Sequence, residues 1–142
     1  MNEKLIQVFD WLKRHRKSVR LLLVLYWGLM FLGTHLPRVP VPLEEVSDKT
    51  LHFLAYFGLY FLLVFDRLSR NAFSWGRAGG LVVLCALYGI ADELLQIPVG
   101  RSADVLDWYA DMRGVLTSLA IIATTAFLTR KFTPPQPDSP KE

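Results

Sequence analysis

The chain has 142 residues, of which 52% are apolar and only 20% are charged. A soluble domain of this size usually carries about a quarter charged residues, and the mean hydropathy here is +0.29. Aromatic residues make up 13% of the chain, which excludes a largely disordered protein. The single cysteine, Cys85, excludes an intramolecular disulfide and lies in an apolar run, where we expect a buried thiol. These figures predict a small integral membrane protein.

Four apolar stretches follow one another along the chain, separated by short polar links. Their uncharged parts are residues 21–37, 50–65, 78–91 and 114–129. At about 1.5 Å per residue, these stretches are shorter than a hydrocarbon core of about 30 Å. We therefore expect each helix to continue past its bounding charges, which draws particular ionisable residues into the membrane.

The predicted fold is all-α, an integral membrane bundle of four transmembrane helices with an N-terminal interfacial helix. Residues 1–20 form a basic segment in which Leu5, Phe9 and Leu12 share one helical face, as in a helix lying at the membrane surface. Residues 21–130 form the four-helix domain. Residues 131–142 are rich in proline and are predicted to be a disordered cytoplasmic tail.

Basic residues predict the orientation of the chain in the membrane. Twelve of the 16 Lys and Arg residues lie in the N-terminal segment, in the link between the second and third spans, and in the tail. The other side holds only Arg38, Lys49, Arg101 and Arg113. Because cytoplasmic loops carry the excess of Lys and Arg, we expect an inner-membrane protein with both termini cytoplasmic. The same rule explains the basic N-terminal run, so no nucleic-acid partner is expected.

Polar residues recur at helical spacing on three of the four predicted spans. Steps of three or four residues place side chains on one face of a helix. The three polar stripes consist of Asp48, His52, Tyr56 and Tyr60, then of Cys85, Gly89, Asp92 and Gln96, and last of Arg101, Asp104, Asp107, Asp111, Gly114 and Ser118. Because lipid cannot satisfy such groups, the stripes should turn inward and meet. Gly89 and Gly114 would permit close helix approach there, while Trp108 and Tyr109 on the reverse face are candidates for an aromatic belt.

The outer ends of these stripes are predicted to line an outward-facing polar cleft that binds a ligand. The candidate binding residues are Asp48, Lys49, His52, Tyr56, Asp92, Glu93, Gln96, Arg101, Asp104, Asp107 and Asp111. The alternative is a structural network in which Arg101, Lys49 and Arg113 neutralise carboxylates and hold the bundle together. Eight of the 13 carboxylates, including Glu44 and Glu45, lie on this side, and this excess favours the ligand site, because buried carboxylates are costly without compensation.

The sequence carries no familiar catalytic signature, such as GxSxG, HExxH, CxxC or a Walker loop. Whether the protein is an enzyme therefore stays open. His52, four residues after Asp48, could be a general base oriented by a carboxylate or one of a pair of metal ligands, and Glu93 is a second acid–base candidate. The sequence assigns no metal site and no cofactor, although the carboxylates would suit a divalent cation such as Mg²⁺ or Ca²⁺.

Three motifs occur in a fixed order along the chain. They are Asp48-Lys49-x-x-His52-Phe53-x-x-Tyr56, then Asp92-Glu93-x-x-Gln96, and last Arg101, Asp107 and Gly114. Together they resemble the VanZ-like family of small bacterial membrane proteins over residues 38–128. The family pattern usually has an asparagine where this chain has Asp111, and the nearby Arg113 suggests a compensating Asp111–Arg113 pair.

The resemblance implies a multi-pass protein of the cell envelope with a role near cell-wall or lipid precursors. The family takes its name from a member associated with low-level resistance to the glycopeptide antibiotic teicoplanin. We therefore expect recognition of an amphipathic envelope ligand, lipid-linked or lipoglycopeptide, with its head group at the carboxylates and Arg101. The alternatives are an enzyme acting on a lipid-linked substrate and a structural subunit of a membrane assembly, and the oligomeric state stays open.

Overall fold

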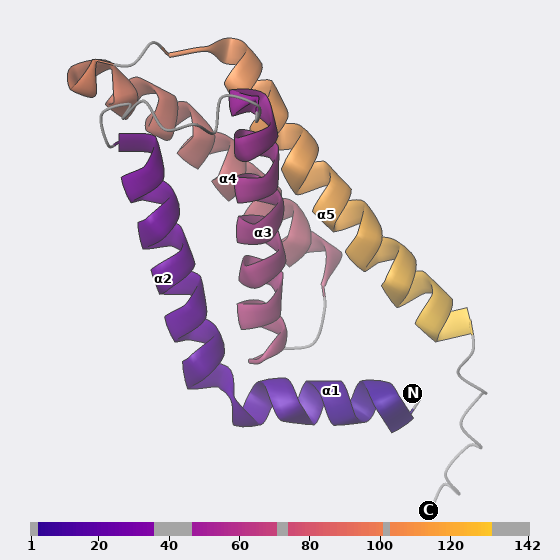
Figure 1. Ribbon diagram of the computed structural model, residues 1–142. Helices are drawn as coiled ribbons and strands as arrows, with labels where there is room; N and C mark the ends of the chain where they lie inside the picture. Colours follow the sequence, from indigo (N-terminus) through magenta and orange to yellow (C-terminus); the bar gives the residue numbers. More distant parts are fainter. Residues whose placement is uncertain (1–2, 36–46, 71–73, 101–102, 132–142) are drawn as a thin grey trace, which may run out of the picture.

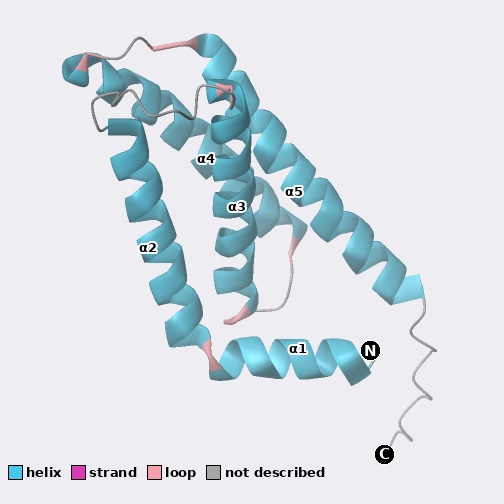
Figure 2. Cartoon of the chain, in the orientation of Figure 1, coloured by secondary structure: helices cyan, strands magenta, loops and turns pink. Residues whose placement is uncertain are grey.

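The computed structural model describes residues 3–35, 47–70, 74–100 and 103–131, and no strand occurs in these ranges. The helices are α1 (Glu3–Arg14), α2 (Arg16–His35), α3 (Asp48–Leu68), α4 (Trp75–Gln96) and α5 (Val105–Lys131), with a 3-10 turn, η1 (Ile97–Val99), after α4. Helices α2 to α5 run along a common bundle, and α1 lies across one end of it (Figures 1 and 2). Of the predicted tail, residues 131–142, Lys131 is the last residue of α5 and residues 132–142 lie outside the described residues.

Within the described ranges, four helical segments are long and apolar enough to cross a membrane. They are Arg16–His35, Asp48–Leu68, Trp75–Val99 and Val105–Leu128. Large apolar side chains remain exposed along them, among them Leu29, Leu87 and Phe127, as expected for surfaces that face lipid. The prediction of an all-α bundle of four transmembrane helices is confirmed.

The helices continue past their bounding charges, as the short uncharged stretches predict. Helix α4 runs through Asp92 and Glu93, and α5 begins nine residues before Gly114. Helix α2 begins at Arg16, before the uncharged stretch that starts at residue 21. Its basic side chains therefore lie at a helix end, from where they can reach the polar membrane surface.

A tight turn joins α4 to α5. Pro98 occupies η1, and Gly100 follows with a φ of 79°, a left-handed conformation that a residue without a Cβ adopts readily. Asp104 precedes α5, and its Oδ1 accepts a hydrogen bond from the backbone N–H of Leu106 at 2.8 Å. This contact caps a helix start that would otherwise leave N–H groups unpaired.

Helix α3 packs most extensively against α5. Gly114 of α5 lies against the backbone carbonyl of Phe53, so a side chain at residue 114 would collide with α3. Gly89 of α4 faces the side chains of Trp108 and Asp111. Both glycines thus permit close helix approach, as predicted. Below them the core is formed by Tyr56, Leu59, Tyr60, Leu63, Leu81, the free thiol of Cys85 and Val115.

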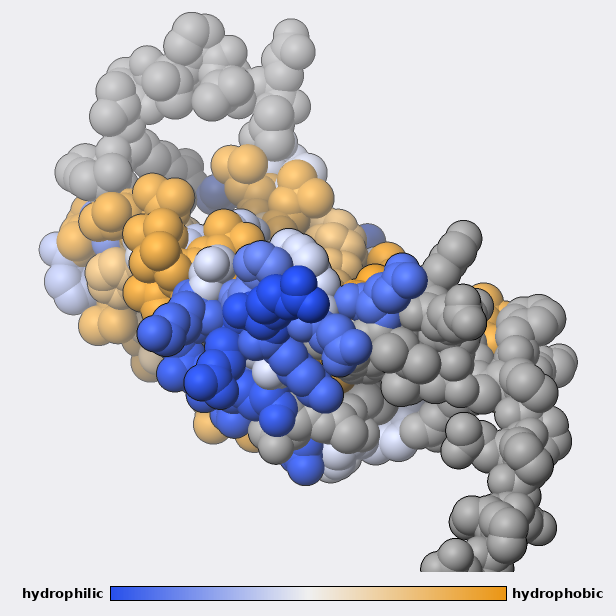
Figure 3. Space-filling view, turned by 90° about the horizontal axis from the view of Figure 1, so that it is seen from below, coloured by the Kyte–Doolittle hydropathy of each residue, from blue (hydrophilic) through white to orange (hydrophobic). Residues whose placement is uncertain are grey.

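The two ends of the bundle differ in charge. The helices alternate in direction, so the start of α2, the α3–α4 link and the end of α5 lie at one end, which we call the basic end (Figure 1). There Asp66 pairs with Arg20 at 3.5 Å and with Arg70 at 3.1 Å. The view onto this end shows hydrophilic residues gathered together (Figure 3). The opposite end, which we call the site end, contains the start of α3 and the α4–α5 turn.

Candidate functional site

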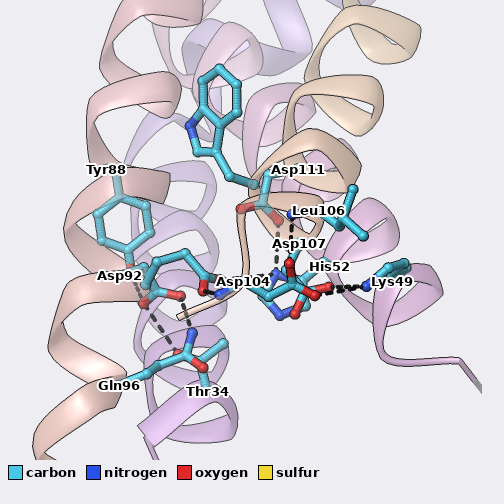
Figure 4. A network of polar contacts seen from close by, with 12 residues as sticks. Thr34, Lys49, His52, Tyr88, Asp92, Gln96, Asp104, Leu106, Asp107 and Asp111 are labelled. Carbon is cyan, nitrogen blue, oxygen red and sulfur yellow. Dashed lines mark hydrogen bonds and ion pairs between the residues drawn. The ribbon is translucent and has the colours of Figure 1, made fainter. Parts of the chain in front are cut away.

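The three polar stripes meet inside the bundle near the site end. His52 of α3, Asp92, Glu93 and Gln96 of α4, and Asp107, Asp111 and Ser118 of α5 are all buried. Tyr56 and Tyr60, one and two turns below His52, are fully buried as well. The structure thus brings together side chains that lie up to 66 residues apart in the sequence, and the prediction that the stripes turn inward is confirmed (Figure 4).

At the centre of the site, His52 is paired with Asp111. The Nδ1 of His52 lies 2.9 Å from Asp111 Oδ1 and 4.0 Å from Glu93 Oε1. The compensating pair expected between Asp111 and Arg113 is not what the structure shows, because Arg113 is exposed and Asp111 turns toward α3. Residues two apart on a helix do not share a face. Asp111 therefore pairs with His52 of α3 and not with Arg113.

Lys49 joins α3 to the start of α5. Its Nζ donates to Asp104 Oδ2 at 3.1 Å and to Asp107 Oδ1 at 3.0 Å. The pKa of the Asp104 carboxyl is lowered, first by the N–H of Leu106 and then by Lys49. The backbone N–H of Asp104 donates to Glu93 Oε2 at 2.9 Å, which ties α4 to the same turn. Lys49 thus neutralises part of the acidic cluster, as the structural alternative expects.

Asp92 lies in a second hydrogen-bonded group beside the first (Figure 4). It accepts hydrogen bonds from Thr34 at 3.2 Å, from Tyr88 at 3.4 Å and from Gln96 at 3.4 Å. The Nδ1 of His35 lies 3.8 Å from the same carboxylate. Thr34, His35 and Tyr88 are not among the site residues predicted from the sequence. Tyr88 is four residues before Asp92, so the spacing that relates Asp48 to His52 would have identified it.

Several buried polar atoms have no hydrogen-bond partner among the described residues. They are Glu93 Oε1, Asp111 Oδ2, Tyr56 Oη, Ser118 Oγ and His35 Nε2. Unpaired buried polar groups are uncommon because each costs about 1–3 kcal/mol. Such atoms are the positions at which a ligand, a proton or a metal ion would be stabilised.

In the part of the chain that the structure describes, two overlapping sets of residues have the chemistry of metal ligands. One is Asp48, His52 and Asp107, and the other is His52, Glu93 and Asp111; in each set the ligand-type atoms lie within 4.8 Å of one another. The second set is buried throughout, whereas Asp48 in the first is only partly buried. Of the other predicted site residues, Arg101 lies outside the described residues, as do Arg38, Glu44 and Glu45.

The chain also matches a known protein family. The model of the VanZ/LLP1 family matches residues 5–128, which include all of the site. The chain belongs to the VanZ/LLP1 family. Neither a curated protein nor a solved structure matches it.

A groove opens on the surface of this VanZ/LLP1 protein, between α3 and α5. Its volume is about 380 Å³, and it is lined by Lys49, Thr50, Phe53, Leu106, Tyr109, Ala110 and Arg113. Tyr109 is 56% exposed here, whereas the indole N–H of Trp108 donates to the carbonyl of Ala86 on α4 at 3.1 Å. Of the two predicted belt residues, only Tyr109 is exposed. The indole N–H of Trp108 instead finds its partner inside the bundle.

Proposed function

We propose that this VanZ/LLP1-family protein binds an amphipathic ligand of the cell envelope with an anionic head group. The groove between α3 and α5 carries this proposal. Its rim holds two cationic side chains, Lys49 and Arg113, and its wall contains Phe53, Leu106 and Tyr109. A mainly apolar groove with a few polar groups is typical of sites that bind lipid-like molecules.

The two cations of the groove differ in their pairing. Lys49 is engaged by Asp104 and Asp107, whereas Arg113 makes no ion pair with any residue the structure describes. A guanidinium group can donate two parallel hydrogen bonds to a phosphate or carboxylate. We therefore assign the head group to Arg113 and the apolar part of the ligand to Phe53 and Tyr109.

We further propose that the site end faces outward and that both termini are cytoplasmic, in the inner membrane. The support is the excess of Lys and Arg at the basic end, which is typical of cytoplasmic loops. Lipid-linked cell-wall precursors and lipoglycopeptides would then meet the groove from the outer leaflet. Binding of such a ligand would account for a link to glycopeptide susceptibility.

Helix α1 lies across the basic end, where the proposed orientation puts the cytoplasmic membrane surface (Figure 1). Leu12 is buried against the bundle, while Val8 and Trp11 remain exposed on a helix that also carries Lys13 and Arg14. Exposed apolar and basic side chains on one short helix are typical of interfacial segments. The side chains of Leu5 and Phe9, which complete the predicted apolar face, lie outside the described residues.

Binding can be measured with the full chain in nanodiscs by native mass spectrometry. The probes are a polyisoprenyl phosphate and the corresponding uncharged alcohol. We expect the phosphate to bind more tightly than the alcohol, and Arg113→Gln to weaken its binding about tenfold by removing a bidentate contact. Arg67→Gln, which changes an exposed arginine at the basic end, is the matched control. Equal binding of both probes, or equal loss in both variants, would contradict the proposal.

An enzymatic function on a lipid-linked substrate is the second candidate, favoured by the His52–Asp111 pair. A carboxylate on Nδ1 orients the imidazole, so Nε2 becomes the nitrogen available for proton transfer. Glu93, with one unpartnered oxygen, is the second acid–base candidate. Release of phosphate from a polyisoprenyl diphosphate by the purified protein, lost in His52→Gln, would establish this function. Binding without any product would leave the protein as a receptor.

A further inference from the structure

Three metal-ligand side chains from three different helices meet in the interior of the bundle. His52 comes from α3, Glu93 from α4 and Asp111 from α5, and their exposed fractions are 5%, 6% and 1%. Nδ1 of His52 lies 2.9 Å from Asp111 Oδ1 and 4.0 Å from Glu93 Oε1. Two ligands that bind one ion at about 2.0–2.2 Å are separated by at most about 4.4 Å, so small side-chain shifts would bring all three to one ion.

The carboxylate oxygens of this group give an independent indication of a cation-binding site. Glu93 Oε1 and Asp111 Oδ2 are buried and have no hydrogen-bond partner among the described residues. Glu93 is held in place through its other oxygen, which accepts the Asp104 N–H. Buried carboxylates without a partner are costly, so an occupant that satisfies both would stabilise the fold.

The neighbouring cationic side chains that the structure describes do not fill this role. Lys49 is engaged by Asp104 and Asp107 at the mouth of the site, and Arg113 lies exposed in the groove. His52 can contribute at most one positive charge to two carboxylates. A divalent ion would balance the local charge, because the imidazole can then bind as a neutral ligand.

We propose that His52, Glu93 and Asp111 form a site for a divalent first-row transition metal ion. One imidazole nitrogen with two carboxylates suits Zn²⁺ or Mn²⁺ better than Mg²⁺, which prefers oxygen ligands and keeps several of its waters. A site formed by α3, α4 and α5 would also link the three helices that carry the polar stripes. The proposal does not depend on the proposed ligand, because it concerns the metal alone.

The test uses the full chain in detergent, stripped with a chelator and loaded separately with Zn²⁺ and Mn²⁺. We expect one ion per chain after desalting, measured by elemental analysis, and a raised melting temperature. Glu93→Gln and Asp111→Asn should each lose the ion. Asp92→Asn, which changes the buried carboxylate next to Glu93, is the matched control and should retain it. No bound ion, or an ion retained by both site variants, would overturn the proposal.

A second measurement needs no variant. Pulsed electron paramagnetic resonance of the Mn²⁺-loaded protein should show coupling to a single imidazole nitrogen, because one histidine binds the ion. A hundredfold excess of Mg²⁺ should leave this signal in place. Absence of nitrogen coupling would remove His52 from the site, and displacement by Mg²⁺ would show that the assignment to a transition metal is wrong.

Discussion

Gly114 of α5 lies directly against the backbone carbonyl of Phe53 on α3, and there is no room between them for a Cβ. This contact lies one residue from His52 on α3 and three residues from Asp111 on α5. The approach of the two backbones therefore sets the distance across which the His52–Asp111 pair forms. Small residues allow such close approach between membrane helices.

We expect Gly114→Ala to destabilise the protein by about 1–3 kcal/mol, because the added methyl group collides with backbone rather than with a side chain that can move. Gly79→Ala is the control, since a Cβ at residue 79 of α4 meets nothing within 4 Å. Thermal melts in detergent would measure both. Equal melting temperatures for the two variants would show that the α3–α5 contact leaves room for a Cβ at residue 114.

The His52–Asp111 pair can be tested by removing one charge or both. His52→Leu leaves buried carboxylates without their base, and we expect a loss of roughly 3–5 kcal/mol. Asp111→Asn should be tolerated far better, because the amide oxygen still accepts a hydrogen bond from His52. The double variant His52→Leu/Asp111→Asn also lacks the buried Asp111 charge, so we expect it to lose less stability than His52→Leu alone. Strictly additive losses would argue against a direct pair.

The orientation can be measured by cysteine labelling of intact cells with a membrane-impermeant maleimide. We expect Ala103→Cys, in the α4–α5 turn, to react in intact cells. Lys13→Cys, at the end of α1, should react only after permeabilisation. Cys85 is buried and should give little background. Labelling of Lys13→Cys in intact cells would reverse the proposed topology.

The sequence predicts a second head-group contact at Arg101, and a variant there separates ligand binding from stabilisation of the fold. Arg101→Lys keeps the charge but loses the planar fork that binds phosphate or carboxylate bidentately. We expect weaker binding of the polyisoprenyl phosphate with a nearly unchanged melting temperature. If Arg101 is instead part of a structural ion pair, the melting temperature of Arg101→Lys should fall, and binding should be lost only in proportion to the loss of folded protein.

Much of the site follows from helical periodicity. The steps of three and four residues correctly placed His52, Tyr56, Asp92, Gln96, Asp107 and Asp111 on buried faces, because a polar stripe on a membrane helix must face away from lipid. The ion-pair and hydrogen-bond partners of these residues were less predictable. Asp111 was expected to pair with Arg113 and pairs with His52 instead, and Asp92 is joined by Thr34 from a helix that showed no polar stripe.

The sequence by itself determined that the chain forms four apolar helices, that three of them carry inward polar faces, and that the two ends differ in charge. These properties depend on composition and on spacing within single helices. Only the tertiary structure decided which residues of different helices meet, because the rotation and tilt of each helix depend on contacts such as that of Gly114 with Phe53. The convergence of His52, Glu93 and Asp111 is a product of that packing, since no local pattern relates residues 52, 93 and 111.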